Sequence, residues 1–563
     1  MQNVAGQATL GLTRSSPTIG IKEEDKDKLQ GILGQSPAAP SASASSSPSA
    51  STDGMGSSKT SSPAGDKGKA DGAKGGDIDD QFQKIIDKAR RLAKEQGGTG
   101  SSAGSEKEQA ALKREFESLL EVITKPQEAM TKEEVTMLKE ACFGPLTYWV
   151  TETRPIAEAE RTGLLIRGNL RSEREEVFQL VVTKVQELFN GKYQVFMIED
   201  PEAEDDGGQR AAVGRGQNVR DVGPRVMFQI IPAAQSTPPQ TDNLQKAASA
   251  ILSALVVVSC LQLALASNIT RLPAETLAWF ANPANLNSDQ LPPGLENWDP
   301  TVYFESSLPI LAAVLGVNLS HEAGHRIMAA VRGVTMGPSF FIPFSEVGTF
   351  GAITPFTSLL RDRKQLWDVA MAGPLTGAAV AATLLVVGLA QTTGADPNDA
   401  EMANFMVKVP TTLFQNSLLL GGFARWALGE TALRAATVPV SPLLVAGWVG
   451  LLTSCLNLLP VGCLDGGRAV QAAFGRQALA LTSFFTYLGL GLGLLGSDLA
   501  LPFGLYVIIT QRTEEKFIQD SVTTPAGARV SLTAAAVLFA VLVLCPMAPE
   551  LADSLGVGPS VRF

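Results

Sequence analysis

Residues 315–331, LGVNLSHEAGHRIMAAV, place two histidines and a glutamate inside a run of residues that is otherwise almost wholly apolar. The chain has 563 residues but only two histidines, and both lie here, as His321 and His325. A carboxylate such as that of Glu322 costs about 3 kcal/mol at membrane depth, and ionisable groups there are candidates for a functional site. This stretch therefore predicts a membrane helix that carries chemistry.

Long apolar runs surround this stretch and lie almost wholly after residue 243. Most of them have about 19 to 25 residues, roughly the length that a helix needs to cross a bilayer. The sequence therefore predicts a mainly α-helical, multi-pass membrane protein with about seven to eight apolar membrane segments. The segments are residues 244–266, 307–331, 367–390, 410–428, 442–462, 478–496, 499–511 and 530–548.

One apolar stretch does not fit a helix. Residues 338–356, PSFFIPFSEVGTFGAITPF, are rich in β-formers and interrupted by Pro and Gly. Irregular backbone at membrane depth is tolerated only where protein or water satisfies its peptide groups. We therefore expect a re-entrant hairpin beside a cavity.

The front of the chain has a different composition. Residues 1–105 are dominated by Ser, Pro, Gly and charged residues and are expected to be disordered, although 79–96 have helical spacing. The first 22 residues hold one Arg, one Lys and no acid, which suits a transit peptide. Residues 106–240 predict a small soluble α+β module, and residues 241–563 the polytopic membrane domain.

Within the module, the spacing of apolar residues predicts the individual elements. The expected helices are 106–124, 131–141 and 173–190, and the expected strands are 163–171, 193–200 and 225–232.

Charge and cysteine content exclude other classes of protein. The net charge of −10 and the pI of about 5.1 argue against nucleic acid as a partner, because phosphate binding needs a concentrated basic surface. The five cysteines have no paired spacing that predicts a disulfide framework or a zinc ribbon.

The two histidines of HEAGH are four residues apart, so on a helix both imidazoles lie on one face and can reach one metal ion. In HExxH proteases the intervening glutamate takes a proton from water that the metal has acidified, which makes Glu322 the candidate general base. A hydrogen-bonded histidine pair at a helix interface is the structural alternative.

A catalytic zinc site keeps three protein ligands, and the chain has no third histidine. The best candidate for the third ligand is Asp465 in residues 455–475, CLNLLPVGCLDGGRAVQAAFG, where Pro and Gly interrupt an apolar helix. Asn457 is a candidate hydrogen-bond donor to a substrate carbonyl or a developing oxyanion. An ordinary helix-ending turn is the alternative for this segment.

HEAGH followed far downstream by Asn457, Pro460 and Asp465-Gly466 resembles the site-2 protease family of intramembrane zinc metalloproteases. Within it, the chain is most similar to the ethylene-dependent gravitropism-deficient and yellow-green family of chloroplasts. The resemblance covers roughly residues 106 to 563 and also rests on RGNLR at 167–171, GTFGAIT at 348–354, MAGPLTGAA at 371–379 and LNLLPVGCLDGGRAVQ at 456–471.

The resemblance implies a Zn²⁺ cofactor held by His321, His325 and Asp465, and ATP-independent cleavage of membrane-protein or peptide substrates within or near their membrane segments. It also implies thylakoid or envelope membranes of the chloroplast and a role in chloroplast development. One departure is visible, because relatives often carry His-Pro where this chain has Ser441-Pro442.

Loop charges predict an orientation in the membrane. The loop 267–306 is acidic, whereas the loop after 307–331 carries four basic residues, which places that loop and the soluble module on the positive side. The segment that ends at Asp465 must return to this side to meet the histidines. We therefore expect 410–428 to make no net crossing.

Two further classes of function stay open on sequence alone. A metal transporter would need ionisable residues along a path, and the apolar segments hold few beyond those named above. A noncatalytic scaffold for photosynthetic membrane proteins would not need the complete set of His321, Glu322 and His325. For every reading the lipid bilayer is a partner, nucleic acid is not, and the sequence sets no oligomeric state.

Overall fold

The computed structural model describes residues 130–158, 161–201, 224–285, 288–396, 399–493 and 499–559, all within one compact unit, Glu128–Phe563. The expected disordered region 1–105, with its helical stretch 79–96, and the expected helix 106–124 lie outside these residues.

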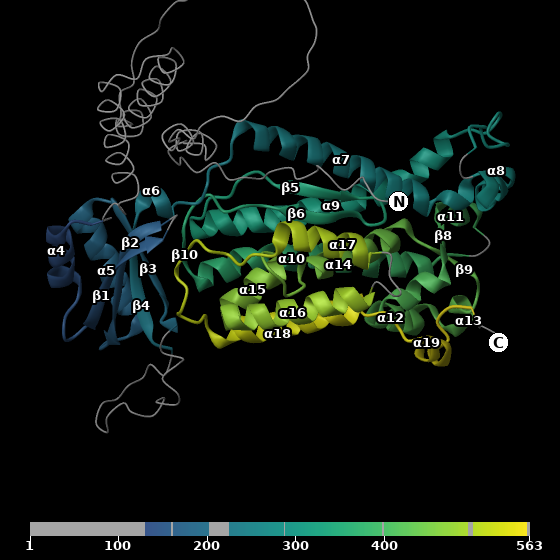
Figure 1. Cartoon of the computed structure of the whole chain (residues 1–563). Coiled ribbons are helices and arrows are strands. Elements are labelled where there is room, and N and C mark those ends of the chain that lie inside the picture. Colours follow the sequence, from purple (N-terminus) through teal and green to yellow (C-terminus); the bar gives the residue numbers. More distant parts are fainter. Residues whose placement is uncertain are drawn as a thin grey trace, which may run out of the picture. The chain divides into compact units, whose positions relative to one another are not determined.

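The soluble module contains the five predicted elements that fall on described residues, with boundaries that differ by one or two residues, together with β1 and α6, which were not predicted (Figure 1). They are α4 (Lys132–Cys142), β1 (Tyr148–Glu158), β2 (Arg161–Leu170), α5 (Arg174–Phe189), β3 (Tyr193–Glu199), β4 (Val226–Pro232) and the short α6 (Ala233–Ser236). Strand β1 was not predicted from the sequence. It contains Pro155 and forms one edge of the sheet, where proline is tolerated because one side of the strand has no ladder partner.

The core of the module forms between the sheet and α5. Tyr148 is fully buried, packs edge-on against Phe228 at 4.9 Å and donates a hydrogen bond of 2.8 Å to the Val226 carbonyl. Gly168 of the GNLR stretch lies in β2 opposite Val150, where an added Cβ would lie 2.7 Å from the Tyr148 ring. This glycine therefore makes room for the tyrosine inside the sheet.

Two strands from the C-terminal part of the chain complete the sheet, whose order is β1-β2-β4-β3-β10-β7. The strands are β7 (Leu360–Asp362) and β10 (Ile518–Asp520). β10 pairs in parallel with β3 through Asp520 and Met197, and with β7 through Ile518 and Leu360. The sheet thus includes residues well beyond the expected module end at residue 240.

Four helices among the described residues are long and apolar enough to cross a membrane. They are α7 (Asn243–Ser267), α9 (Thr301–Arg332), α10 (Arg363–Thr393) and α18 (Gly527–Leu544). Shorter apolar helices are α12 (Leu418–Leu428), α14 (Pro442–Asn457) and the pair α17 (Ala500–Tyr506) and η5 (Val507–Gln511). The fold is therefore that of a multi-pass membrane protein, and the part described holds four candidate spans.

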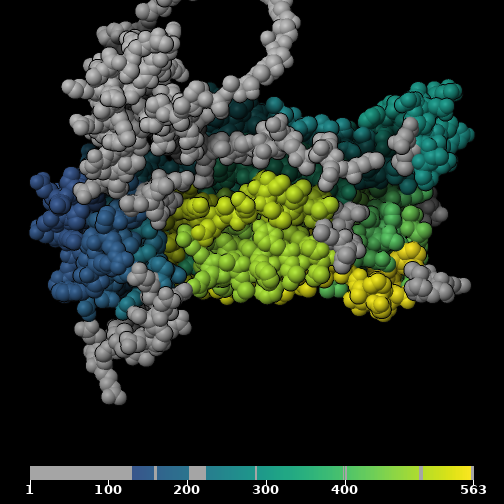
Figure 2. Space-filling model, viewed as in Figure 1, coloured from purple at the N-terminus to yellow at the C-terminus, as the bar shows by residue number. Residues whose placement is uncertain are grey.

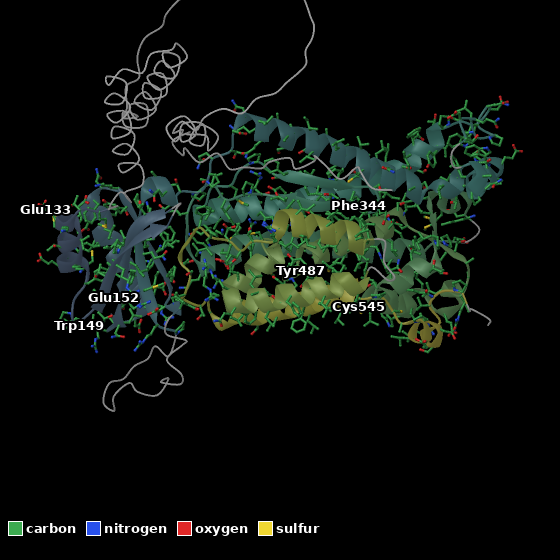
Figure 3. All side chains as sticks on the ribbon, viewed as in Figure 1. Glu133, Trp149, Glu152, Phe344, Tyr487 and Cys545 are labelled. Atoms are coloured by element: carbon green, nitrogen blue, oxygen red, sulfur yellow. The ribbon has the colours of Figure 1, made fainter. Side chains whose placement is uncertain are left out.

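The remaining elements are short or peripheral, apart from the 18-residue α16. They are η2 (Ile269–Arg271), α8 (Ala274–Ala281), η3 (Pro283–Asn285), α11 (Ala400–Phe405), η4 (Thr411–Asn416), α13 (Glu430–Leu433), α15 (Asp465–Phe474), α16 (Arg476–Gly493) and α19 (Pro549–Leu555). Phe484 and Phe485 of α16 are exposed. The yellow-green surface on the face seen in Figure 2 includes α16. Figure 3 draws the side chains on the ribbon and labels Glu133, Trp149 and Glu152 in the module and Phe344, Tyr487 and Cys545 in the membrane domain.

The predicted hairpin within 338–356 is confirmed. Strands β5 (Phe340–Phe344) and β6 (Gly348–Ile353) pair antiparallel, with Phe340 opposite Ile353 and Phe344 opposite Gly348. Gly348 and Gly351 have φ of 80° and 104°, a region of backbone space that favours glycine. The hairpin packs against α7, α9 and α14.

The segment 410–428 is not one helix. Strands β8 (Val407–Pro410) and β9 (Thr437–Val440) pair antiparallel, with Pro410 opposite Thr437, so the chain between them leaves and returns at the same place. Within that loop, α12 has 11 residues and is about 16 Å long, which is too short for a crossing.

Candidate metal centre

Helix α9 positions both histidines and the glutamate. His321 and His325 lie one turn apart, and Gly324 between them allows close contact with α10, because a Cβ there would lie 2.6 Å from the Ala372 carbonyl oxygen. Glu322 and His325 are both buried, whereas His321 is partly exposed. The predicted helical face of HEAGH is therefore formed and turned into the protein.

Asp465 reaches the histidines because the chain reverses sharply between α14 and α15. Gly462 has a φ of 50°, and a Cβ there would overlap the Gln511 carbonyl oxygen. A Cβ on Gly466 would lie 2.0 Å from the Leu458 carbonyl oxygen, so the first turn of α15 packs directly on the end of α14. Asp465 is the first residue of α15, where the helix dipole favours a carboxylate.

The three predicted ligands converge. His321 Nε2 lies 3.1 Å from Asp465 Oδ2 and 3.1 Å from His325 Nε2, and His325 Nε2 lies 3.2 Å from Asp465 Oδ2. A tetrahedral zinc ion with bonds of about 2.0 Å separates its ligand atoms by about 3.3 Å. The arrangement of the three atoms therefore fits a zinc ion.

The hydrogen bond made by the other nitrogen of His325 supports this assignment. Nδ1 lies 2.8 Å from the Val369 carbonyl oxygen, which can only accept, so this nitrogen carries the proton. In the neutral ring, Nε2 then presents a lone pair toward Asp465 and His321. This arrangement suits a metal ion, and a backbone carbonyl that accepts from the other ring nitrogen is typical of metal-binding histidines.

Two glycines of α10 leave room for the imidazoles. A Cβ on Gly373 would lie 2.1 Å from His325 Nε2, and a Cβ on Gly377 would lie 3.0 Å from His321 Cβ. Both glycines of the MAGPLTGAA stretch therefore pack directly against the candidate ligands.

Glu322 is held by three side chains that sequence reasoning did not identify. Its Oε1 accepts a hydrogen bond of 2.7 Å from Arg326 Nε and another from the Ser339 hydroxyl, and its Oε2 accepts one of 3.1 Å from the Thr354 hydroxyl. The spacing of Glu322 and Arg326 by four residues on a helix was a usable signal for the first contact. The other two depend on the fold of the hairpin.

Asn457 is buried and shares a small cavity with Asp465. Its Nδ2 donates to the carbonyl oxygens of Phe350 at 3.1 Å and Thr453 at 2.8 Å. The amide therefore links the end of α14 to the hairpin strand β6.

Comparisons with known proteins agree with this geometry. The family model of peptidase family M50 matches residues 309–495, and that of the EGY3 middle domain matches residues 136–237. The chain is 42% identical over 436 residues to the "Probable zinc metalloprotease EGY1, chloroplastic" of Oryza sativa subsp. japonica. The aligned residues cover 77% of this chain and 71% of that protein. The chain belongs to the EGY family, within peptidase family M50.

Other EGY family members are also similar. The protein of the same name from Arabidopsis thaliana is 42% identical over 430 residues, covering 76% of this chain and 74% of that protein. The "Probable zinc metalloprotease EGY2, chloroplastic" of Arabidopsis thaliana is 30% identical over 416 residues, covering 74% and 65%. No solved structure matches the chain.

Ser441, which stands where relatives often carry a histidine, lies away from the candidate metal ligands of this EGY family member. Ser441 is the N-cap of α14, and its hydroxyl accepts a hydrogen bond from the Leu443 backbone at 3.2 Å and contacts Gln391 Oε1 at 2.6 Å. Asn457 ends the same helix, whose 16 residues span about 24 Å. Serine at this position therefore supports the start of the helix.

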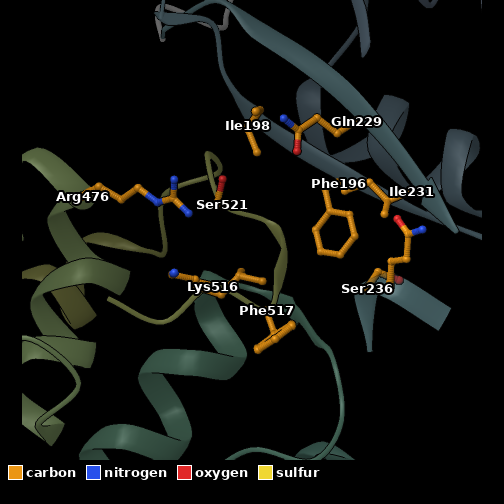
Figure 4. A pocket seen from close by; sticks show the side chains of 11 residues that line it. Phe196, Ile198, Gln229, Ile231, Ser236, Arg476, Lys516, Phe517 and Ser521 are labelled. Atoms are coloured by element: carbon orange, nitrogen blue, oxygen red, sulfur yellow. The ribbon is translucent and has the colours of Figure 1, made fainter. Parts of the chain in front are cut away.

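A second cavity lies beside strands β3, β4 and β10 of the module sheet, next to the start of α16 (Figure 4). Phe196, Gln229 and Ile231 line it on one side, and Arg476 and Lys516 on the other. None of the candidate metal ligands lines this cavity.

Proposed function

We propose that the chain is an intramembrane zinc metalloendopeptidase that cleaves membrane proteins within or near their membrane segments in plastid membranes, thylakoid or envelope, and supports chloroplast development. The observation that carries this proposal is the convergence of His321, His325 and Asp465 within 3.2 Å of one another beside Glu322 on a long apolar helix. Membership of the EGY family supports the same chemistry.

We assign the metal-binding role to His321, His325 and Asp465 and the general-base role to Glu322. Zinc, when bound, acidifies water and polarises the scissile carbonyl. Glu322 accepts the proton of the attacking water on its carboxylate and delivers it to the departing amine nitrogen. Val369 orients His325 through its backbone carbonyl.

We assign Asn457 as the donor to the substrate carbonyl or to the oxyanion that develops from it. Both protons of its amide are occupied by the carbonyls of Phe350 and Thr453. A substrate carbonyl must therefore replace one of them, and the Phe350 carbonyl on the hairpin is the one that can move with bound substrate.

We further propose that an unwound substrate segment adds as a strand to the hairpin of β5 and β6. A helical substrate hides its peptide groups in its own hydrogen bonds, whereas an added strand exposes them to the site. The hairpin contacts Asn457 through Phe350 and Glu322 through Thr354, so it lies beside both proposed catalytic groups.

For the membrane topology, we propose that the shorter apolar helices join the four long ones to make about seven to eight apolar segments around a re-entrant hairpin. The residues between β8 and β9 make no net crossing, as the pairing of these strands suggests. The pairing of β7 with β10 in the module sheet supports a shared, positive side for the module and the loop after α9.

The test compares the wild-type chain with Glu322→Gln. Purified wild type is expected to hold about one zinc per chain and to cleave a membrane-protein substrate. Glu322→Gln should retain the zinc and lose about 10²–10⁴-fold in cleavage rate. If the variant supports plastid development as well as wild type does, the chain acts as a scaffold for photosynthetic proteins and the protease assignment fails.

A further inference from the structure

We propose that Arg326 is a positioning residue that, together with the hydroxyls of Ser339 and Thr354, couples the Glu322 carboxylate to the hairpin of β5 and β6. The inference rests on the proposed function, in which Glu322 is the general base and the hairpin receives substrate. It adds a physical connection between these two parts.

Arg326 lies one turn after Glu322 on α9 and binds two partners beyond it. Its Nε donates to Glu322 Oε1 at 2.7 Å, while its Nη2 donates to the Gly337 carbonyl oxygen at 3.0 Å and to Ser339 Oγ at 2.6 Å. The planar guanidinium fork thus holds the base with one nitrogen and the chain that enters β5 with another.

Both ends of the hairpin hold the same carboxylate. Ser339 directly precedes β5 and donates to Oε1, whereas Thr354 directly follows β6 and donates to Oε2. Ser339, Thr354 and Glu322 are all buried, so water does not replace these contacts freely. A displacement of either end of the hairpin therefore changes the position of the carboxylate.

The contacts leave the carboxylate fixed but still able to act. An ionised carboxylate offers about four acceptor positions, and three of them are occupied by Arg326, Ser339 and Thr354. One position remains for the proton of water. Hydrogen bonds from a charged donor are strong. The three donors therefore fix the direction in which the free acceptor position of the carboxylate points.

The same helix offers a matched control in Arg332. Its side chain is 41% exposed and contacts the buried Asp368, while that of Arg326 is 44% exposed and contacts the buried Glu322. The substitutions Arg326→Ala and Arg332→Ala each remove a half-exposed arginine from α9, and each leaves a buried carboxylate with one partner fewer. Only Arg326 touches the hairpin and the proposed base.

The experiment measures kcat, KM and zinc content of the full chain in detergent, with a membrane-protein substrate that wild type cleaves. Arg326→Ala should lower kcat by about 10- to 100-fold, as expected for a misplaced catalytic group, with zinc content unchanged and KM within about two-fold. Guanidinium added at millimolar concentration should restore part of kcat, because the site of the lost side chain is open to solvent. Arg332→Ala should retain kcat and should not respond to guanidinium.

Arg326→Lys and Thr354→Val extend the test if Arg326→Ala does not accumulate. Lysine keeps the charge but lacks the fork, so kcat should fall less than with alanine, and Thr354→Val should lower kcat with unchanged zinc. Wild-type kcat in these variants, equal loss in Arg332→Ala, or loss of zinc together with kcat would overturn the inference alone. Absence of zinc and cleavage in wild type would overturn the proposed function, and the inference with it.

Discussion

Two buried carboxylates on neighbouring helices have opposite surroundings. Asp368 on α10 is 6% exposed and receives two hydrogen bonds from Arg529, at 2.9 and 3.3 Å, as well as a contact from Arg332. Asp465 on α15 is 8% exposed and faces the imidazoles of His321 and His325. The first acid has arginine countercharges within the protein, whereas the second faces two histidine nitrogens that lie close enough to share one metal ion with it.

This difference separates a structural from a functional acid. The guanidinium of Arg529 donates to Asp368 through Nε and Nη2 and lies 5.5 Å from the Trp367 ring, so these contacts join α10 and α18. Arg332 adds α9 to the same cluster. Asp465 makes no ion pair with an arginine in the described part of the chain, and its Oδ2 lies within 3.2 Å of the Nε2 atoms of both histidines, an arrangement that could hold a metal ion.

The largest expected effect comes from exchanging each acid for its amide. Asp465→Asn removes the anionic ligand and should abolish zinc binding and cleavage, a loss of at least about 10³-fold. Asp368→Asn should keep the zinc and cost about 1.5–3 kcal/mol in stability, because hydrogen bonds to a charged group are weakened. Metal analysis and thermal unfolding of both variants measure the two effects, and equal zinc loss would contradict the contrast.

The next effect tests the space around the ligands. Gly373→Ala would put a methyl group 2.1 Å from His325 Nε2, so we expect the ring to be displaced and zinc and cleavage to fall by about 10²-fold without removal of a ligand. Gly316→Ala on α9 is the matched control, since nothing lies within 4 Å of the added Cβ. Zinc retained in Gly373→Ala would show that the ring tolerates the methyl group.

The sequence predicted those parts of the site that can be recognised from residue type and spacing. His321, Glu322 and His325 follow from HEAGH on a helix, and Asp465 follows from the need for a third ligand at a break in an apolar segment. The hairpin followed from Pro and Gly among β-formers. HEAGH and the hairpin each followed from one local pattern, whereas Asp465 was predicted only in combination with HEAGH.

What the sequence did not predict depends on contacts between distant segments. β7 and β10 are three residues each, and neither has a pattern of its own that would place it beside β3. Ser339 and Thr354 are ordinary hydroxyl residues until the hairpin brings both to Glu322. The number of membrane spans was also open, because hydropathy does not distinguish the short α12 in its returning loop from a crossing.

A smaller effect is expected from Gly351→Ala in the hairpin. Gly351 has a φ of 104°, and a Cβ there would lie 2.6 Å from the Asn457 amide. Cleavage should fall by about 10-fold through the displaced strand and amide, while zinc content stays near that of wild type. Equal loss of zinc and cleavage would contradict the prediction that the hairpin acts in cleavage and not in zinc binding.

The smallest effect concerns a third carboxylate, which has a lysine partner on the module surface. Lys192 donates to Glu134 at 2.7 Å, and this hydrogen bond, with one from the Thr131 backbone, lowers the pKa of Glu134 to about 2 from its ordinary value of 4.5. Because the folded-state pKa is depressed, the contact stabilises the protein fully above pH 4.5 and progressively less as the pH falls toward 2.

Glu134→Gln should therefore lower the melting temperature by about 1–3 °C at pH 7, as expected for a surface ion pair, and by less at pH 3. Glu133→Gln, at the exposed neighbouring position, is the control for loss of a charge without loss of the lysine contact. Zinc content should be the same in both variants, because an acid that is neutralised by its own protein partner contributes to stability and not to metal binding. A pH-independent difference between wild type and Glu134→Gln would mean that the lysine contact is not what the carboxylate contributes.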